Sequence, residues 1–394
     1  MEFDPRKFIL ELKKSNKKEL TIILPCRNEE LALPHCLKQI YHVLKNNNIN
    51  AEIIISDSST DKSPEIAKKF SKYLNLKIIK HNKEGYGNAY IHAFPHINSD
   101  YIFMADADAS YDFNEIPKFL NSLKEGNDFV IGNRFSKKME KEVMPWSHKY
   151  IGNPVLSGLL RLLYKTKIKD CHCGMRAIKT SSLKKLNLQT TGMEFASEMI
   201  VKALKNNLII KQFPITYKPR IGASKLKTIS DGWRHLRFML LYSPLFLFFI
   251  PGLILFLIGI SSISLLYFKN LEIFGFTFYI HPMFLSSILI IAGYQLIIFS
   301  IFAKTYSITH LDEKNLFFEK LYKYITIERA SLIGIFIILL GLTIFTTIFY
   351  KWTSSNFGEL NEIKNSIIAL TLITIGVQTI FSSFMLSILG IKEK

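Results

Sequence analysis

Four long apolar stretches near the end of the chain restrict its fold more than any other feature of the sequence. They cover about residues 245–268, 283–303, 330–350 and 366–391, and none contains Asp, Glu, Lys or Arg. Each is long enough to cross the hydrocarbon core of a bilayer as a helix. In lipid, an isolated span must satisfy its backbone hydrogen bonds internally, which only a helix does. We therefore predict four transmembrane helices, and the absence of charges argues against an ion pathway or a transporter.

Basic residues between these stretches predict the orientation in the membrane. The middle connection is rich in Lys and Arg, whereas the two outer connections together carry three lysines. By the positive-inside rule, the middle connection, the N-terminal domain and the C-terminus are cytoplasmic, so we expect a multi-pass membrane protein. The N-terminal segment also lacks the apolar core of a signal peptide. The basic residues are Lys304, Lys314, Lys320, Lys323 and Arg329 in the middle connection, and Lys269, Lys351 and Lys364 in the others.

Upstream of the spans, short apolar runs alternate with helical stretches. The runs at 20–25, 51–57, 76–81, 101–105 and 128–135 are predicted strands, each followed by a polar cluster. Strands that alternate with helices in this way indicate an α/β domain with a mostly parallel, doubly wound sheet.

The fourth predicted strand ends in two carboxylates one residue apart, Asp106 and Asp108. In open α/β sheets, ligands bind beyond the carboxyl ends of the strands. Two hard oxygen ligands at this spacing suit Mg²⁺ or Mn²⁺ shared with substrate phosphates. Taken alone, such a pair also fits an ordinary solvated turn.

Further polar residues follow the other strands. Glu29, Asp57 and Asp106 all lie at or shortly after the ends of apolar runs, so they should meet at one sheet edge, where a carboxylate commonly holds a ribose hydroxyl or a base. Asp57 could instead cap the next helix, and Gly85 and Gly87 could form a plain turn. The shared position of Glu29, Asp57 and Asp106 at one sheet edge favours a nucleotide site over these alternatives.

The formal net charge of +18 has no zinc-finger or RNA-binding signature beside it, so we expect no nucleic-acid partner. A basic face against anionic lipid headgroups explains the charge better. The four cysteines, Cys26, Cys36, Cys171 and Cys173, lack the spacing of a zinc site and are expected to be reduced thiols.

Ordered motifs over roughly residues 20–240 give a resemblance to a known family. They are PCRNEE (25–30), SDSSTD (56–61), EGYGNA (84–89), ADAD (105–108), GNR (132–134), DCHCGMR (170–176), TGMEF (191–195) with Glu198, and PRIGASKL (219–226). In this order they resemble the family 2 glycosyltransferases with the GT-A fold, and most closely the polyprenyl-phosphate sugar transferases such as dolichol-phosphate mannose and glucose synthases. One departure is that Ala109-Ser110-Tyr111 stands where mannose synthases usually carry Leu-Gln-His, so no third metal ligand is identified.

The resemblance, which ends near residue 240, implies the first of three domains and a set of site residues, whereas the apolar pattern of the sequence predicts the other two. The domains are a GT-A Rossmann-like domain over 1–223, a juxtamembrane amphipathic helix over 224–244 and a four-helix transmembrane domain over 245–394. Asp106, Asp108 and Arg220 would be catalytic, with the two acids also holding the metal. The nucleotide-sugar residues would be Pro25, Arg27, Asn28, Glu29, Asp57, Gly87 and Asp106, and the acceptor phosphate would bind Arg134, Arg220 and Lys225.

The expected function is inverting, metal-dependent transfer of a single hexose to a polyprenyl (dolichyl or undecaprenyl) phosphate for glycan assembly. The partners would be a nucleotide sugar of the UDP-glucose or GDP-mannose class, the polyprenyl phosphate and the bilayer. The oligomeric state stays open, a homo-oligomer included. One alternative is a processive or lipid-linked-oligosaccharide glycosyltransferase, although Asp231-Gly232-Trp233-Arg234 stands where processive synthases usually carry Gln-x-x-Arg-Trp. The other is an inactive nucleotide-binding scaffold, against which the intact acidic pair counts.

Overall fold

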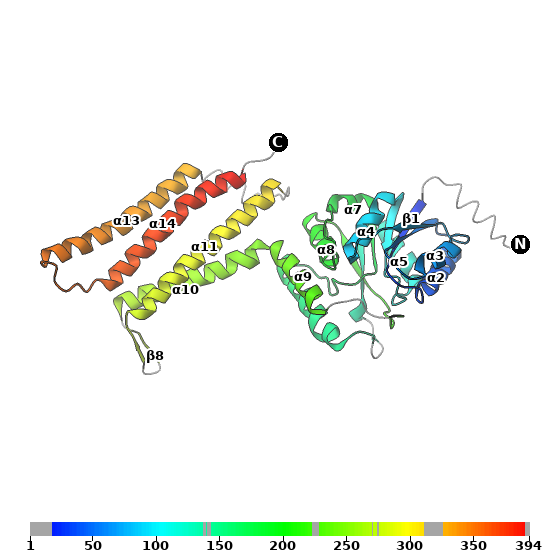
Figure 1. Ribbon diagram of the computed structural model, residues 1–394, viewed down its shortest axis with the longest axis horizontal. Coiled ribbons are helices and arrows are strands. Elements are labelled where there is room, and N and C mark those ends of the chain that lie inside the picture. The colour runs from blue at the N-terminus through cyan, green and yellow to red at the C-terminus, as the bar shows by residue number, and fades with distance from the viewer. Residues whose placement is uncertain are drawn as a thin grey trace, which may run out of the picture. The chain divides into compact units, whose positions relative to one another are not determined.

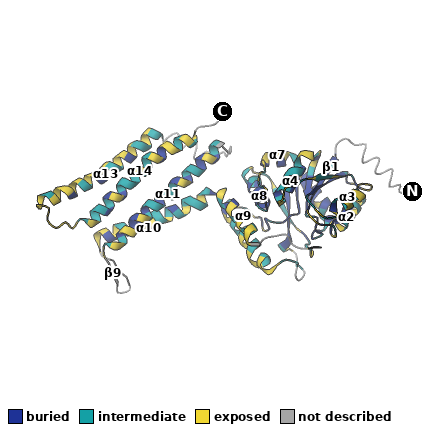
Figure 2. Ribbon diagram, viewed as in Figure 1, coloured by how far each residue is buried: buried dark blue, intermediate teal, exposed yellow. Residues whose placement is uncertain are grey.

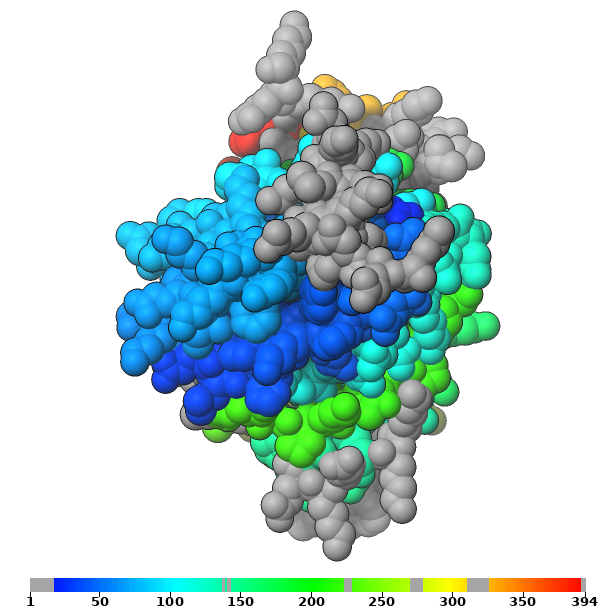
Figure 3. Space-filling view, turned by 90° about the vertical axis from the view of Figure 1, so that its right-hand side faces the viewer, coloured from blue at the N-terminus to red at the C-terminus, as the bar shows by residue number. Residues whose placement is uncertain are grey.

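The computed structural model describes residues 18–136, 139, 143–222, 228–269, 271–273, 276–310 and 326–390. The chain divides into two compact units, Met1–Tyr242 and Ser243–Lys394. Figure 1 shows an α/β unit containing the sheet and a second unit of long helices. On the face seen in Figure 3, residues from the start of the first unit (blue) border later ones (cyan and green), so distant segments share one surface.

A seven-stranded sheet forms the centre of the first unit, in the order β3-β2-β1-β4-β6-β5-β7. Its described strands pair in parallel except β6, which is antiparallel to both β4 and β5. Because β6 runs the opposite way, it begins at the edge where β4 ends, and Arg176 pairs with Met104 there. The strands are β1 (Lys18–Cys26), β2 (Ala51–Asp57), β3 (Leu76–Lys80), β4 (Ser99–Met104), β5 (Phe129–Asn133), β6 (Arg176–Lys179) and β7 (Ile210–Pro214).

The apolar strands are buried because helices cover both faces of the sheet. Ile22, Ile23 and Leu24 of β1 have no exposed surface, and Figure 2 shows the central strands in the buried colour. Residues buried on both faces read as continuous apolar runs in the sequence. The helices are α2 (Leu33–Asn46), α3 (Ser63–Phe70), α4 (Tyr86–Ala93), α5 (Ile116–Lys124), α6 (Asn153–Tyr164), α7 (Thr180–Leu186), α8 (Phe195–Lys205) and α9 (Thr228–Leu241).

The predicted fold class is confirmed. The five predicted strands appear as β1 to β5, in a Rossmann-like sheet of the GT-A type, and four apolar helices follow. The sequence analysis did not predict β6 and β7. The predicted juxtamembrane segment corresponds to α9, which belongs to the first compact unit.

The second unit contains, within the described residues, four helices long and apolar enough to cross a membrane. They cover Leu245–Phe268, His281–Thr309, Ile327–Ser354 and Ile363–Gly390. The first comprises a π-helical turn (Leu245–Phe249) and α10 (Ile250–Phe268), and the others are α11 (His281–His310), α13 (Ile327–Ser354) and α14 (Ile363–Gly390). A short hairpin of β8 (Leu271–Ile273) and β9 (Phe276–Phe278) lies between α10 and α11.

Glycines let the membrane helices approach in pairs. A Cβ atom on Gly293 of α11 would lie 2.7 Å from the Gly252 carbonyl oxygen of α10. Likewise, a Cβ atom on Gly376 of α14 would lie 2.7 Å from the Gly334 carbonyl oxygen of α13. The α10–α11 and α13–α14 pairs therefore pack backbone against backbone, as small residues permit in membranes.

Neutral hydrogen bonds connect these two pairs through α11 and α14. The hydroxyl groups of Ser287 and Thr371 are 2.6 Å apart, and those of Tyr294 and Thr379 are also 2.6 Å apart. Each joins a side chain of α11 to one of α14. The interface between the pairs is thus polar without being charged at these positions.

Candidate active site

A cleft of about 520 Å³ opens at the carboxyl edge of the sheet in the first unit. This volume is within the range of small-molecule sites. Its walls come from the ends of β1 and β4, the turn before α4, the segment before β6, and α9. The predicted site residues that line it are Pro25, Arg27, Glu29, Asp106, Asp108, Arg134 and Arg220.

The other predicted residues lie elsewhere. Asp57 and Asn28 line a neighbouring cavity of about 370 Å³ beyond the ends of β1 and β2, and Arg27 lines both cavities. Gly87 is buried, and a Cβ atom there would lie 2.1 Å from the Thr190 carbonyl oxygen, so it contributes close packing. Lys225 lies outside the described residues.

Asp106 carries an unsatisfied oxygen in the cleft. Its Oδ1 atom is shielded from solvent and has no hydrogen-bond partner among the described residues. Burial raises the pKa of this carboxyl group, and the nearby charge of Asp108 raises it further. A buried carboxylate oxygen without a hydrogen bond is costly, so a cation beside Oδ1 would stabilise it.

Asp108 is held by the turn that follows it. Ala109 has a left-handed backbone (φ 62°), which non-glycine residues rarely adopt. This turn lets the backbone N–H and hydroxyl of Ser110 donate to Asp108 Oδ1 at 3.0 and 2.5 Å. No group of three or more His, Cys, Asp or Glu residues suited to a metal occurs in the described parts of the chain. The carboxylate oxygens of Asp106 and Asp108 are of the type that a divalent ion such as Mg²⁺ or Mn²⁺ prefers.

Arg220 reaches both acidic positions from the segment after β7. Its guanidinium lies 3.3 Å from Glu29 Oε1 and 3.8 Å from Asp108 Oδ2. The Lys218 N–H donates to the Ser110 carbonyl and the Ile221 N–H to the Asp108 carbonyl, both at 2.9 Å. The backbone that carries Arg220 is therefore fixed directly to the acidic segment.

Arg134 lines the cleft but is already engaged in a buried ion pair. Its Nε and one terminal nitrogen donate to the two oxygens of Asp170 at 2.8 and 2.9 Å, and its backbone N–H also donates to Asp170. This bidentate pair uses much of the donor capacity that we expected an acceptor phosphate to take. Asp170 is 36 residues away in sequence, so the pairing could not be inferred from the motif alone.

The glycine turn before α4 lies against the backbone of residues 190–192. Gly85 has φ 124°, and the Gly87 N–H donates to the Gly192 carbonyl oxygen at 3.2 Å. Glu198, which is fully buried, fixes this neighbouring segment by accepting from the N–H and hydroxyl of Thr190 at 2.8 and 2.6 Å. The position of the Gly85–Gly87 turn, which we predicted to be part of a nucleotide site, thus depends on the carboxylate of Glu198, more than 100 residues later in the chain.

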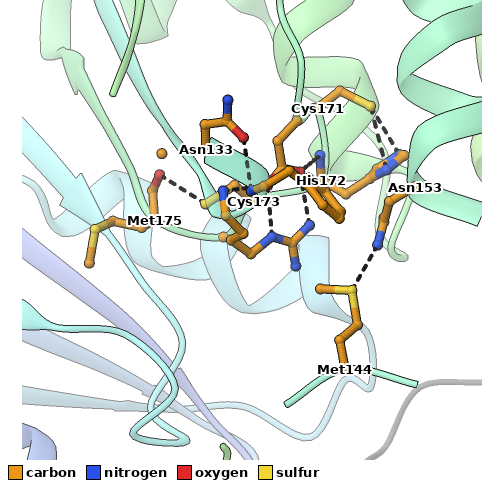
Figure 4. Close-up of polar contacts among 12 residues, drawn as sticks. Asn133, Met144, Asn153, Cys171, His172, Cys173 and Met175 are labelled. Carbon is orange, nitrogen blue, oxygen red and sulfur yellow. Dashed lines mark hydrogen bonds and ion pairs between the residues drawn. The ribbon is translucent and has the colours of Figure 1, made fainter. Parts of the chain in front are cut away.

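Sequence reasoning missed three residues at the α9 end of the cleft, His172, His235 and Arg234. Ser197 Oγ lies 2.8 Å from His235 Nδ1 and 3.3 Å from His172 Nε2. Burial lowers the pKa of both imidazoles, that of His235 to about 4. In the sequence, His172 stood within the DCHCGMR motif and Arg234 within the Asp231–Arg234 run, and neither pattern assigned them to the site. Figure 4 shows the Cys171 sulfur beside the His172 ring, and the four cysteines are free and buried.

Comparison with protein families gives two matches. Residues 21–186 match glycosyl transferase family 2, and residues 301–390 match the glycosyltransferase family 2 C-terminal transmembrane region.

The most similar relatives include the low-salt glycan biosynthesis hexosyltransferase Agl6 of Haloferax volcanii, which is 36% identical over 94% of this chain and 89% of the relative. A dolichyl-phosphate hexose transferase of the same organism is 28% identical over 54% of this chain and 89% of its own length. A dolichol-phosphate mannosyltransferase of Pyrococcus furiosus is 29% identical over 55% of this chain and 62% of its own length. Among solved structures, glucosyl-3-phosphoglycerate synthase of Mycobacterium tuberculosis aligns with a TM-score of 0.47 and 15% identity, over 62% of this chain and 85% of that one.

Proposed function

The chain belongs to glycosyl transferase family 2, and from that membership we propose that it transfers a single hexose from a nucleotide sugar to a polyprenyl phosphate. The observation that carries the proposal is the joint position of Asp106, Asp108 and Arg220 in one cleft beyond the sheet edge. Two carboxylates with one unsatisfied buried oxygen suit a divalent ion, and an arginine beside them suits phosphate.

The donor side of the reaction needs its leaving group stabilised. The bond between the anomeric carbon and the donor phosphate oxygen breaks, and a nucleoside diphosphate departs with the electron pair. Asp106 and Asp108 would hold Mg²⁺ or Mn²⁺, which when bound supplies Lewis-acid stabilisation of that diphosphate.

The acceptor side needs positioning more than activation. A phosphate monoester is largely a dianion at neutral pH because its second pKa is near 6, so its oxygen can attack the anomeric carbon without a strong general base. Attack from the face opposite the leaving group gives inversion. Because Arg134 is paired with Asp170, we assign the acceptor phosphate to Arg220, Arg234 and Lys225, and Arg134 remains a lining residue of the cleft.

The names of the relatives support this acceptor class. Two of them are a dolichyl-phosphate hexose transferase and a dolichol-phosphate mannosyltransferase, and another is a hexosyltransferase of glycan biosynthesis. We infer a donor of the UDP-glucose or GDP-mannose class and a product used in glycan assembly.

A transfer assay tests the proposal. Membranes containing the protein are incubated with a panel of radiolabelled UDP- and GDP-hexoses, a polyprenyl phosphate and Mn²⁺ or Mg²⁺. Label should move into an organic-extractable lipid that mild acid cleaves, releasing one hexose, and Asp106→Asn membranes should show none. Label in an aqueous polymer would instead support a processive synthase, and no transfer from any donor would support the scaffold alternative.

We also propose that the catalytic unit and both termini face the cytoplasm, on the basis of the basic residues flanking the spans. A reporter inserted after Glu359, between α13 and α14, should then be accessible from outside the cell. Accessibility only from the cytoplasmic side would reverse the orientation.

A further inference from the structure

A cluster of three side chains near the α9 end of the cleft has no role in the reaction as described above. His172 lies before β6, Ser197 belongs to α8 and His235 belongs to α9. The two imidazole rings have their centroids 4.1 Å apart, and the Ser197 hydroxyl lies between His172 Nε2 and His235 Nδ1. Both histidines line the cleft that contains Asp106 and Asp108.

The strand order indicates which part of a donor would reach this cluster. Along the edge of the sheet the order is β2, β1, β4, β6, so Asp57 on β2 and the acids after β4 lie on one side of the β6 end. A nucleoside bound beyond β2 and β1, with its diphosphate at the acids, directs the hexose toward β6. His172 precedes β6, which begins at this edge because it is antiparallel to β4.

The chemistry of the cluster suits a neutral polyol better than a phosphate. Burial holds both imidazoles neutral at pH 7, and Arg176, beside them, adds a positive charge that disfavours their protonation. In a neutral pair bridged by one hydroxyl, Ser197 donates to one ring and accepts from the other. The two remaining ring nitrogens, His235 Nε2 and His172 Nδ1, are then one donor and one acceptor. His172 Nδ1 lies 3.4 Å from the Cys171 sulfur, a weak partner that a sugar hydroxyl group can replace, and a second hydroxyl group can pair with His235 Nε2.

We propose that the cluster of His172, Ser197 and His235 binds hydroxyl groups of the donor's hexose ring and so determines which hexose the enzyme accepts. This inference rests on the proposed function, because it names the sugar-selecting part of the same site. It separates recognition of the donor into two parts. The nucleoside and diphosphate are held by the β1, β2 and β4 ends, and the hexose by neutral groups around the start of β6.

Calorimetric titration of the full chain in detergent micelles with Mn²⁺ tests the proposal. The probes are UDP against UDP-glucose and GDP against GDP-mannose, with wild type, His172→Phe and His235→Phe. Phenylalanine keeps the ring shape and removes the hydrogen bonds. The wild type shows which nucleotide series, UDP or GDP, the protein binds. In that series, the affinity of each histidine variant for the diphosphate should stay within about twofold of the wild-type value, and its affinity for the nucleotide sugar should fall about fivefold to tenfold. His42→Phe, an exposed histidine on α2, should change neither value.

Sugar selectivity gives a second readout. For each protein, the affinities for two epimers of one donor, such as UDP-glucose and UDP-galactose, are expressed as a ratio. The ratio should differ from one in the wild type and approach one in the histidine variants. If a phenylalanine variant loses diphosphate binding together with its fold, Ser197→Ala replaces it, since without the bridging hydroxyl the two rings no longer hold each other's tautomer and orientation.

Equal weakening of diphosphate and nucleotide-sugar binding in folded variants, or unchanged binding of both, would overturn the proposal. Wild-type protein that binds neither diphosphate would contradict the proposed function itself.

Discussion

The two units of this chain hold polar groups in opposite ways. In the catalytic unit, buried polar side chains are often charged and are paired with charged or backbone partners, as Arg134 is with Asp170. In the membrane unit, the contacts between α11 and α14 use hydroxyl groups, as between Ser287 and Thr371. An aqueous domain obtains its stability from apolar burial and can therefore accommodate a few buried charges. Helices in lipid lack that driving force and depend on close backbone contact and neutral hydrogen bonds.

Buried polar atoms without a hydrogen-bond partner occur in the described parts of both units, for example Gln378 Oε1 in α14, but only some of them line the cleft. The catalytic unit leaves Asp106 Oδ1 without a hydrogen bond in a cleft, next to a second carboxylate. Natural proteins keep such costly arrangements mainly where they serve function. Four substitutions test this contrast between the units.

Asp106→Asn should have the largest effect. We expect transfer to fall by about 1000-fold or more, because the cation loses an anionic ligand. Since the charged form of Asp106 is disfavoured by burial and by Asp108, the variant should unfold at the same or a higher temperature in EDTA. The assay is lipid-linked transfer with thermal unfolding in parallel. Asp100→Asn, at the other end of β4, is the matched control and should keep activity. Near-normal turnover of Asp106→Asn with EDTA present would exclude a metal at this position.

Gly376→Ala should destabilise the membrane unit. The added Cβ atom would lie 2.7 Å from the Gly334 carbonyl oxygen, so α13 and α14 must move apart, at a cost of about 1–3 kcal/mol. Gly390→Ala, on the same helix but with open space around it, should be neutral or slightly stabilising. Unfolding of the protein in mixed micelles by increasing SDS measures both. Equal stability of the two variants would show that this glycine contact is not a packing constraint.

Arg220→Lys should reduce turnover about tenfold or more, equivalent to about 1.4 kcal/mol of barrier. Lysine keeps the charge but cannot make the paired hydrogen bonds of a guanidinium to phosphate. The Arg220 guanidinium lies beside Glu29 and Asp108 in the cleft, not against lipid headgroups, so the substitution should not change membrane association. The measurement is transfer rate together with flotation on liposomes. Full activity would mean that a positive charge alone suffices and that the acceptor site lies elsewhere.

Ser287→Ala should have the smallest effect, about 0.6 kcal/mol of stability, because hydrogen bonds between membrane helices are worth little on average. A double-mutant cycle with Thr371→Val isolates the coupling between the two hydroxyl groups. Coupling well above 2 kcal/mol would indicate that the α11–α14 contact relies on polar bonds more strongly than membrane helices usually do.

The sequence predicted the parts of the fold that depend on local pattern. The run at 51–57 is observed as β2 with the same bounds, and the acids follow β4 as expected. In contrast, β6 has the sequence RAIK, with two cations among four residues, and shows no apolar run. Its place between β4 and β5 is determined by tertiary pairing, which the sequence pattern does not encode.

The candidate site divides in the same way. Residues shortly after predicted strands, such as Glu29, Asp106 and Asp108, do line one cleft. From the sequence we considered Arg234 only in the run compared with the motif of processive synthases, and its place in the cleft depends on how α9 packs in the first unit. Contacts between distant segments, rather than local periodicity, determine these residues.

The contact between the glycine turn and the 190–192 segment also limits how this protein can diverge in sequence. Gly85 and Gly87 each leave space for a backbone carbonyl of a residue more than 100 positions later, and Glu198 keeps that backbone in place. A larger residue at either glycine would have to be accompanied by a shift of the distant segment, and a change at Glu198 would release the segment from the turn. We expect these positions to change together or not at all, so that covariation among relatives links two motifs that look independent in a single chain.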